Sequence, residues 1–231
     1  MISSVDNSKI KTLLKLKQSK YRKQEQMFIV EGAHLVSEAR LASVLIEAYS
    51  IEEKEGYVQV SETVMKKVCN TDTVVKEIGL CRMLTKTEIT DKVLILDGIQ
   101  DPGNMGSLMR SACAFGFDTI FIGTGSVDIY NDKVIRSSQG AIFKLNFLFG
   151  NVCDFVKNLS HKVYGTNVES GIPLKKIKKE DKLAIILGNE GNGISKEVNA
   201  LGLDNIFIPM RNTESLNVAV AGSIILYEFG F

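Results

Sequence analysis

The most constraining feature of this chain is a pair of short apolar runs near its end, each followed by a loop of small and polar residues. Residues 183–187 and 206–208 have the length and the branched side chains of buried strands. The first run leads into the glycine-rich loop 188–193, and the second leads into residues 209–217. In an open α/β sheet, ligands sit beyond the carboxyl ends of strands, where loops expose backbone donors and acceptors. We expect the two strands to be neighbours, so their loops predict a pocket that grips one small molecule mainly through the main chain.

The remainder of the second half alternates predicted strands with predicted helices. Strands that are apolar throughout are typical of a parallel sheet covered on both faces. The sequence therefore predicts an α/β fold with a parallel sheet. The expected strands, besides the two above, are residues 93–96, 119–122, 143–147 and 162–166, and the expected helices are 107–115, 133–138, 152–159 and 218–229.

The first half predicts a smaller α/β unit. After an N-terminal helix, strands are expected at 27–30, 44–48, 57–60 and 78–84, and helices at 33–41 and 62–69, the second capped by Ser61. The polar stretch 85–91 contains few apolar residues and is typical of a domain boundary. We therefore predict two domains, residues 1–88 and 89–231.

The net charge of +1 conceals a basic N-terminus. A local basic surface attracts a polyanion even when the whole protein is nearly neutral. Charge alone favours a simpler interpretation, in which this stretch is the solvated face of a helix whose apolar residues turn inward. Those apolar residues are Ile10, Leu13, Leu14 and Leu16. The basic residues, set against only Asp6 and Glu25, are Lys9, Lys11, Lys15, Lys17, Lys20, Arg22 and Lys23.

Several classes of protein are disfavoured by what the sequence lacks. No apolar run reaches the roughly 18 residues that a membrane span needs, and the start lacks the apolar stretch of a signal peptide. Four cysteines without C-x-x-C pairing and two histidines argue against a zinc site or any other metal centre, and indicate reduced thiols in a cytoplasmic protein. The glycine-rich loops match neither G-x-G-x-x-G nor the P-loop. Because G-x-S-x-G is also absent, a serine hydrolase is not indicated either.

Three segments, in order, resemble the motifs of the SpoU/TrmH branch of the SPOUT methyltransferases. They are DPGNMGSLMRSACAFG at 101–116, LGNEGNGIS at 187–195 and IPMRNTESLNVAVAGSIILYE at 208–228. The N-terminal KTLLKLKQSKYRKQEQMFIVEG also resembles the small substrate-binding domain of many members, which has an L30-like ribosomal-protein fold. The resemblance implies S-adenosylmethionine as methyl donor and a ribose 2′-hydroxyl in RNA as acceptor. It also implies a homodimer formed through the C-terminal domain and a trefoil-knotted C-terminal region.

The resemblance also indicates which residues contact the cofactor. Adenine can be bound by main-chain groups between apolar side chains, and glycines permit a close approach of the backbone. Gly193 fits plain turn geometry as well as it fits ligand contact. The predicted cofactor residues are Thr166, Leu187, Gly188, Asn189, Gly191, Ile208, Met210, Ser215 and Leu216.

The catalytic candidates come from all three motifs. Asn104 and Arg110 are six residues apart across the expected turn into a helix, so we expect both to face one cleft. The family places this arginine at the acceptor ribose, either as a base or as a clamp on the adjacent phosphate. A guanidinium stays protonated in proteins, which favours the clamp. Glu190 is expected to order its loop or to lie near Arg110, with a direct chemical role second. Ser215 and Asn217 complete the set, and Asn217 fits a helix N-cap equally well.

The basic N-terminus gives the predicted RNA contacts Lys15, Lys17, Lys20, Arg22 and Lys23. Arg136 is a further candidate, and exposure on a helix surface explains it almost as well. One position departs from the family pattern, because Asn212 stands where the third motif commonly has glycine. Asparagine tolerates left-handed backbone geometry better than most residues.

Three functions fit these predictions. The first is a ribose 2′-O-methyltransferase, and the two-domain layout resembles the ribosomal RNA enzymes more than those that act on transfer RNA. The second is an RNA-binding protein that keeps the fold without catalysis, although such a protein has no need of a cofactor pocket. The third is methylation of an acceptor other than RNA, which leaves the basic N-terminus without a purpose.

Overall fold

The computed structural model describes residues 1–71, 73–84, 88–168, 170–178 and 180–230. The chain forms two compact units, each built from two stretches of sequence. The first comprises Met1–Leu84 and Asp128–Phe143, and the second comprises Thr85–Val127 and Lys144–Phe231. Residues 85–87, which belong to the predicted boundary stretch, lie outside the described residues. The assignment of separate functional domains to 1–88 and 89–231 stays a prediction.

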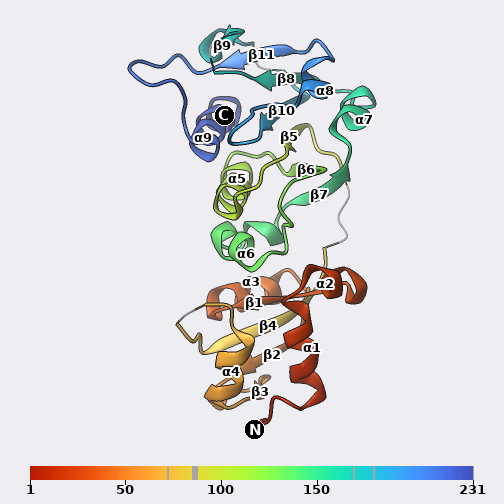
Figure 1. The fold of residues 1–231 in the computed structure, drawn as a ribbon, viewed down its shortest axis with the longest axis vertical. Helices are drawn as coiled ribbons and strands as arrows, with labels where there is room; N and C mark the ends of the chain where they lie inside the picture. Colours follow the sequence, from red (N-terminus) through yellow and green to blue (C-terminus); the bar gives the residue numbers. More distant parts are fainter. Residues whose placement is uncertain (72, 85–87, 169, 179, 231) are drawn as a thin grey trace. The chain divides into compact units, whose positions relative to one another are not determined.

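The first unit is built on a four-stranded sheet (Figure 1). Strands β1 and β2 run antiparallel to β4, which lies between them, and β3 runs parallel to β2 at the edge. The strands are β1 (Met27–Glu31), β2 (Leu45–Ser50), β3 (Val58–Gln59) and β4 (Glu77–Arg82). The helices of the N-terminal stretch are α1 (Ser8–Leu16), α2 (Ser19–Glu25), α3 (Ala33–Leu41) and α4 (Glu62–Val68).

The basic N-terminus forms two helices where the sequence predicted one. Gln18 stands between α1 and α2 with extended backbone angles, φ −95° and ψ 131°. The break is stabilised by Arg22, whose Nη1 donates to the carbonyls of Leu16 (3.1 Å) and Lys17 (2.9 Å) at the end of α1. Carbonyls at a helix C-terminus have no partner within the helix, so a guanidinium that reaches them favours this ending.

The stretch Asp128–Phe143 packs against β1 of the first unit. The Phe28 ring lies 4.7 Å from that of Tyr130 and 6.4 Å from that of Phe143, measured between centroids. Helix α6 (Asp132–Ser138) and the short 3-10 helix η1 (Ala141–Phe143) form here. Local sequence patterns gave no sign that this stretch belongs with the N-terminal unit.

The second unit is built on a seven-stranded sheet in which every pairing is parallel. This confirms the predicted α/β class with a parallel sheet. The order across the sheet is β7-β6-β5-β10-β8-β11-β9. The bounds are β5 (Lys92–Asp97), β6 (Thr119–Gly123), β7 (Asn146–Gly150), β8 (Lys162–Thr166), β9 (Ile172–Pro173), β10 (Leu183–Gly188) and β11 (Asp204–Phe207).

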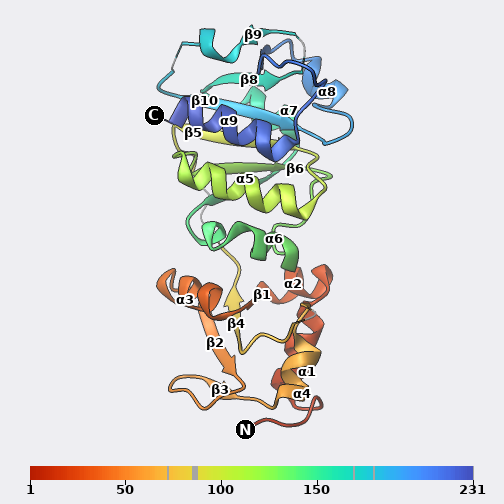
Figure 2. The ribbon, with the colours of Figure 1, turned by 90° about the vertical axis from the view of Figure 1, so that its left-hand side faces the viewer.

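Helices cover both faces of this sheet. Helices α5 (Pro102–Ala114) and α9 (Val218–Gly230) run side by side on one face, as Figures 1 and 2 both show. Helices α7 (Val152–Lys157) and α8 (Lys196–Asn199) lie on the other face (Figure 1). The central strands β5 and β10 are therefore buried on both sides, which explains why their sequences are apolar throughout.

Three expectations about this unit were wrong in detail. Strand β8 lies between β10 and β11, so the two loop-bearing strands are not neighbours. Helix α5 begins at Pro102, because proline suits the first helical position and Asp101 caps the helix by accepting from the Asn104 N–H (2.8 Å). Strand β7 begins at Asn146, later than predicted.

Candidate functional site

A cavity of about 520 Å³ opens at the carboxyl ends of β8 and β10, beside the loop that follows β11. This is the edge of a parallel sheet at which ligands are expected. All of the residues predicted for cofactor contact line this cavity. They are Thr166, Leu187, Gly188, Asn189, Gly191, Ile208, Met210, Ser215 and Leu216. Thr166 lies at the end of β8, between the strands that lead into the two predicted loops.

The loop 188–193 is closed on itself and needs two of its glycines. Asn189 and Gly193 exchange backbone hydrogen bonds of 2.9 Å in both directions. A side chain on Gly188 would place its Cβ 2.1 Å from the Gly193 carbonyl carbon, so no larger residue fits there. Gly193 has a φ of +67°, in the left-handed region that favours glycine. Gly193 therefore serves the turn and also lines the cavity.

A chain of hydrogen bonds connects the three motif segments. The Glu190 carboxylate accepts from the backbone N–H groups of Gln100 (3.2 Å) and Asp101 (3.0 Å) and from the Asn104 amide (3.0 Å). The Asn104 side-chain oxygen in turn accepts from the Asn217 amide (3.0 Å). Glu190 thus orders its loop against the start of α5, which is the first of the roles predicted for it.

The environment of Glu190 keeps its carboxyl ionised. Partial burial raises the pKa of Glu190, but hydrogen bonds from Asn104, from the backbone of Asp101 and from that of Gln100 outweigh it, so the net pKa lies below its ordinary value. A carboxylate is an acceptor only. Asn104 must therefore point its NH₂ group at Glu190 and its oxygen at Asn217.

Asn217 has a structural role beside any catalytic one. Its side-chain oxygen accepts from the backbone N–H groups of Ala219 (2.9 Å) and Val220 (3.2 Å), which makes it the N-cap of α9. Ser215 lies exposed in the preceding loop and lines the cavity. Asn212, in the same loop, has a φ of +60°. Asn212 therefore adopts the left-handed geometry, which asparagine tolerates better than most residues.

Arg110 is exposed on α5, and among the described residues no hydrogen bond or ion pair holds it. Because α5 begins at Pro102, Asn104 and Arg110 both belong to the helix, and six helical residues turn the side chain by roughly 120° net. The expected turn between the two residues is therefore wrong, because both lie on the helix, and the expectation that they face one cleft stays a prediction. Asn104 faces the Glu190 loop, and Arg110 points from a different side of the helix.

Some residues of the site were not predicted. Asp97, at the end of β5, accepts from the Ser195 N–H (2.8 Å) and so anchors the far end of the second motif. The sequence feature that could have identified Asp97 is its position at the end of an apolar strand. Val218, Ala221 and Ile225 line the cavity from α9, and their helical spacing was the signal in their case. Glu214 also lines the cavity and precedes the predicted Ser215.

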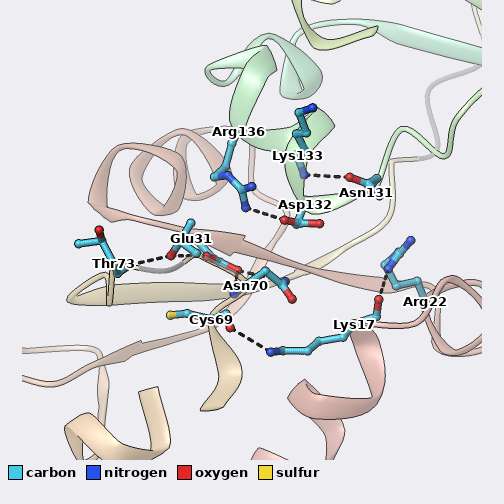
Figure 3. A network of polar contacts seen from close by, with 11 residues as sticks. Lys17, Arg22, Glu31, Cys69, Asn70, Thr73, Asn131, Asp132, Lys133 and Arg136 are labelled. Atoms are coloured by element: carbon cyan, nitrogen blue, oxygen red, sulfur yellow. Dashed lines mark hydrogen bonds and ion pairs between the residues drawn. The ribbon is translucent and has the colours of Figure 1, made fainter. Parts of the chain in front are cut away.

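The predicted RNA contacts in the first unit divide into exposed lysines and side chains that are bound within the protein. The exposed ones are Lys15, Lys20 and Lys23. Lys17 turns inward, and its Nζ donates to the carbonyls of Lys67 (2.8 Å) and Cys69 (2.9 Å), as Figure 3 shows for Cys69. The Lys17 ammonium is therefore already engaged within the protein.

Arg22 does not belong to an exposed RNA footprint in this structure. Its side chain is only 8% exposed and forms an ion pair of 2.6 Å with Asp128. Burial raises the pKa of the Asp128 carboxyl, but the Arg22 bond and hydrogen bonds from Tyr130 and Ser19 outweigh it, so the net pKa is lowered. Arg136 is half-buried and pairs with Asp132 on its own helix at 2.6 Å, which accords with the alternative of a helix-surface residue (Figure 3).

Neither a metal-binding cluster nor a membrane-spanning helix occurs in the described part of the chain. Among those residues, no three or more His, Cys, Asp or Glu side chains gather as a metal-binding group would require. No described helix combines the length and the apolar character needed to span a membrane.

Comparison with known proteins identifies the family. Residues 91–227 match the SpoU rRNA Methylase family, and residues 7–78 match the MRM3-like substrate binding domain. The chain is 34% identical to the 23S rRNA (guanosine(2553)-2′-O)-methyltransferase RlmP of Bacillus subtilis (strain 168), over 98% of each chain.

Solved structures of relatives agree with this match. A structure from Porphyromonas gingivalis, assigned to the TrmH family of RNA methyltransferases, superposes with a TM-score of 0.85 and 30% identity over 98% of both chains. An AdoMet-bound rRNA methyltransferase from Sinorhizobium meliloti, at 24% identity, shares the fold with a TM-score of 0.86 over 98% of this chain and 95% of its own. Since the family match spans more than half of the sequence, the chain belongs to the SpoU rRNA Methylase family.

Proposed function

We propose that this protein transfers a methyl group from S-adenosylmethionine to a ribose 2′-hydroxyl of structured ribosomal RNA. The observation that supports this best is the hydrogen-bond chain from Glu190 through Asn104 to Asn217, which joins three motifs beside one cavity. The relative from Bacillus subtilis is named as a 23S rRNA methyltransferase and matches over 98% of the chain, which favours 23S rRNA as the substrate.

The cavity suits S-adenosylmethionine in size and in chemistry. A volume of about 520 Å³ lies within the range of pockets for ligands of this size. Leu187, Ile208 and Ile225 offer apolar walls for an adenine ring, and the strand ends offer backbone donors and acceptors. Glu214, an exposed carboxylate at the cavity, suits a ligand that bears positive charge. When bound, S-adenosylmethionine supplies an activated methyl group.

The residues of the chain would act mainly by positioning. Asp97 and Glu190 hold the two ends of the second motif, so the cavity wall is set before any ligand arrives. Arg110 is exposed and available for bidentate contact with a phosphate of the RNA. Holding the ribose hydroxyl and the methyl donor in line is the largest effect open to such a site, because proximity replaces a bimolecular encounter.

The proposal includes three further properties of the family. We infer a homodimer through the second unit, supported by the exposed apolar residues of α9. We also infer a trefoil-knotted C-terminal region, supported by the family match over residues 91–227. A cytoplasmic location follows from ribosomal RNA as substrate.

The decisive experiment is methyl transfer in vitro. The full chain, labelled S-adenosylmethionine and a 23S rRNA transcript are incubated together, and the RNA is then digested to nucleosides. We expect label in a 2′-O-methylated nucleoside, and S-adenosylhomocysteine should suppress it. Reverse-transcription mapping of the same RNA identifies the ribose.

The outcome separates the remaining functions. Label on transfer RNA but not on 23S rRNA would move the substrate to the tRNA class. RNA binding without binding of S-adenosylmethionine, measured by calorimetry, would leave only a non-catalytic RNA-binding protein. Either result would overturn the proposed function.

A further inference from the structure

The turn between α1 and α2 is held by hydrogen bonds and an ion pair of Arg22, a residue that the sequence predicted to contact RNA. Arg22 reaches the carbonyls of Leu16 and Lys17 and also pairs with Asp128. Ser19, the first residue of α2, donates from its hydroxyl to the same Asp128 carboxylate at 2.8 Å. Figure 3 shows Arg22 against Lys17 and Lys17 against Cys69. These contacts fix the angle at which α2 leaves α1.

This bracing gathers an aromatic ring and two free cations on one outer surface. The ammonium groups of Lys15 and Lys20 lie 6.0 Å and 5.9 Å from the centre of the Tyr21 ring. Both lysines are exposed, and Tyr21 is half-buried. Within the described residues, no ion pair involves either ammonium group and no hydrogen bond involves the Tyr21 hydroxyl. Glu25, in the last turn, is the acidic residue of α2.

An aromatic ring flanked by unpaired cations fits one class of partner better than others. RNA that is not in a duplex presents bases that stack on aromatic side chains, with a phosphate on either side of each base. A distance of about 6 Å is the outer limit of a cation–π contact, so little attraction holds the two ammonium groups at the ring. Each can therefore move to a phosphate at small cost. A protein partner could pair acidic side chains with the two lysines, but such side chains would leave the Tyr21 ring without a role.

We propose that Tyr21 is an RNA contact that stacks on an unpaired base, with Lys15 and Lys20 bound to the phosphates beside it. Arg22 then acts by fixing the turn, and Lys17 acts by holding the end of α1 to the end of α4, so neither side chain touches RNA. This rests on the proposed function for the identity of the RNA, but it can fail separately. It predicts that the first unit prefers loops and single strands to plain duplex.

The first test compares two half-buried tyrosines of the same unit. Tyr21→Leu removes the proposed stack, and Tyr57→Leu is the control, since Tyr57 also lies beside cations but its Lys54 is paired with Glu77 at 2.6 Å. Binding of the full-length protein to a short oligoadenylate and to the 23S rRNA transcript is measured by fluorescence anisotropy. Stacking of one base is worth at least about fivefold in affinity. We expect that decrease for Tyr21→Leu, full retention for Tyr21→Phe, and no change for Tyr57→Leu.

The second test separates stacking from charge. Lys15→Ala combined with Lys20→Ala should reduce the slope of log K against log salt by about 0.7 for each phosphate that is no longer neutralised. Tyr21→Leu should leave the slope unchanged, because stacking releases no counterions. The control for charge is Lys66→Ala combined with Lys67→Ala, which removes two exposed lysines from α4 of the same unit. That control should keep the wild-type slope.

A direct readout is available from the tyrosine itself. The chain has six tyrosines, so 3-fluorotyrosine labelling gives six fluorine resonances, and the one missing in Tyr21→Phe belongs to Tyr21. We expect that resonance to shift when oligoadenylate is added. An unmoved resonance at saturating RNA, or equal affinities for Tyr21→Leu and Tyr57→Leu, would overturn the inference. If the 23S transcript is methylated in the same preparations, the proposed function survives that failure.

Discussion

Asn104 uses both ends of its side-chain amide, and this limits what it can do during a reaction. Its nitrogen donates to Glu190 and its oxygen accepts from Asn217. Because Asn217 also caps α9, a substitution at Asn104 would remove hydrogen bonds both to the second motif loop and to the residue at the start of α9. We therefore interpret Asn104 as a residue that positions the three motifs. The sequence grouped it with the catalytic residues and had no means of separating the two roles.

The first prediction concerns the charge at this junction. Asn104→Asp would place a second carboxylate within hydrogen-bond reach of Glu190. Two such carboxylates cannot both remain ionised easily, so one pKa of the pair rises, and a protonated carboxyl can again donate as the amide does. We expect methyl transfer to fall about 100-fold at pH 8. The ratio of variant to wild-type rate should recover as the pH is lowered toward about 5, in single-turnover assays.

Asn104→Ala is the matched control for that experiment. It removes the donor without adding a charge, so its rate relative to the wild type should not recover in acid. Equal pH dependence of the two variants would contradict the hydrogen-bond arrangement between Glu190 and Asn104.

The second prediction concerns Arg110, which is not among the residues that line the cavity. Arg110→Ala should leave the affinity for S-adenosylmethionine within a few-fold, measured by calorimetry. It should reduce methyl transfer about 100-fold or more, because the variant lacks the group that positions the RNA. Arg110→Lys keeps the charge but not the planar fork, so an intermediate rate is expected. Failure of a folded Arg110→Ala protein to bind the cofactor would refute the assignment.

At the level of elements, the sequence predicted most of what local patterns determine. Strand β8 and helix α3 have the predicted bounds, and α9 is longer by one residue. The elements that the sequence failed to predict are either too short to show a pattern or depend on contacts between distant residues. Strand β9 has two residues and helix α8 has four, too short for a periodicity to be visible. The break between α1 and α2 depends on Arg22 and Asp128, which are far apart in sequence. No glycine or proline at residues 17–18 marks the break.

The third prediction concerns the stability contributed by that Arg22–Asp128 pair. Removing one partner of a buried ion pair leaves the other charge uncompensated, at a cost of about 3 kcal/mol. Asp128→Asn should therefore lower the free energy of unfolding by about that amount at neutral pH, measured by urea denaturation. Because folding lowers the pKa of Asp128, the folded wild type binds fewer protons at this site than the unfolded chain. Its contribution is present above the unfolded pKa and is lost as the pH falls through the lower folded pKa.

The control is a similar pair with more exposure. Asp132 and Arg136 are each about one-third exposed, so Asp132→Asn should cost no more than about 0.5 kcal/mol. The difference between wild type and Asp128→Asn should shrink in acid, below about pH 4. A difference that persists unchanged at about pH 3 would mean that packing, and not the charge pair, accounts for the destabilisation.

At the scale of the whole molecule, the sheet order was beyond the sequence. Patterns identified the two loop-bearing strands, but nothing in residues 162–166 says that this strand inserts between them. Pairing depends on contacts between distant segments, and the strand that was misplaced is the one that supplies Thr166 to the cavity. The predicted cofactor residues nevertheless line the cavity, and all of them except Thr166 come from the second and third motifs, which name positions without needing the topology.

The last prediction concerns the association of two copies. Helix α9 lines the cavity with Ala221 and Ile225, yet Val220, Ile224 and Tyr227 on another side are 49%, 40% and 59% exposed. Their spacing of four and three residues places them in one stripe, and an exposed apolar stripe is typical of an interface.

We expect light scattering to give twice the chain mass of 25.5 kDa for the wild type. Val220→Glu combined with Ile224→Glu should give the single mass and keep cofactor affinity, because both side chains face away from the cavity. Leu41→Glu, at a residue 78% exposed in the first unit, should leave the dimer intact. A wild type that is monomeric at assay concentrations, or a double variant that stays dimeric, would show that this stripe does not join two copies.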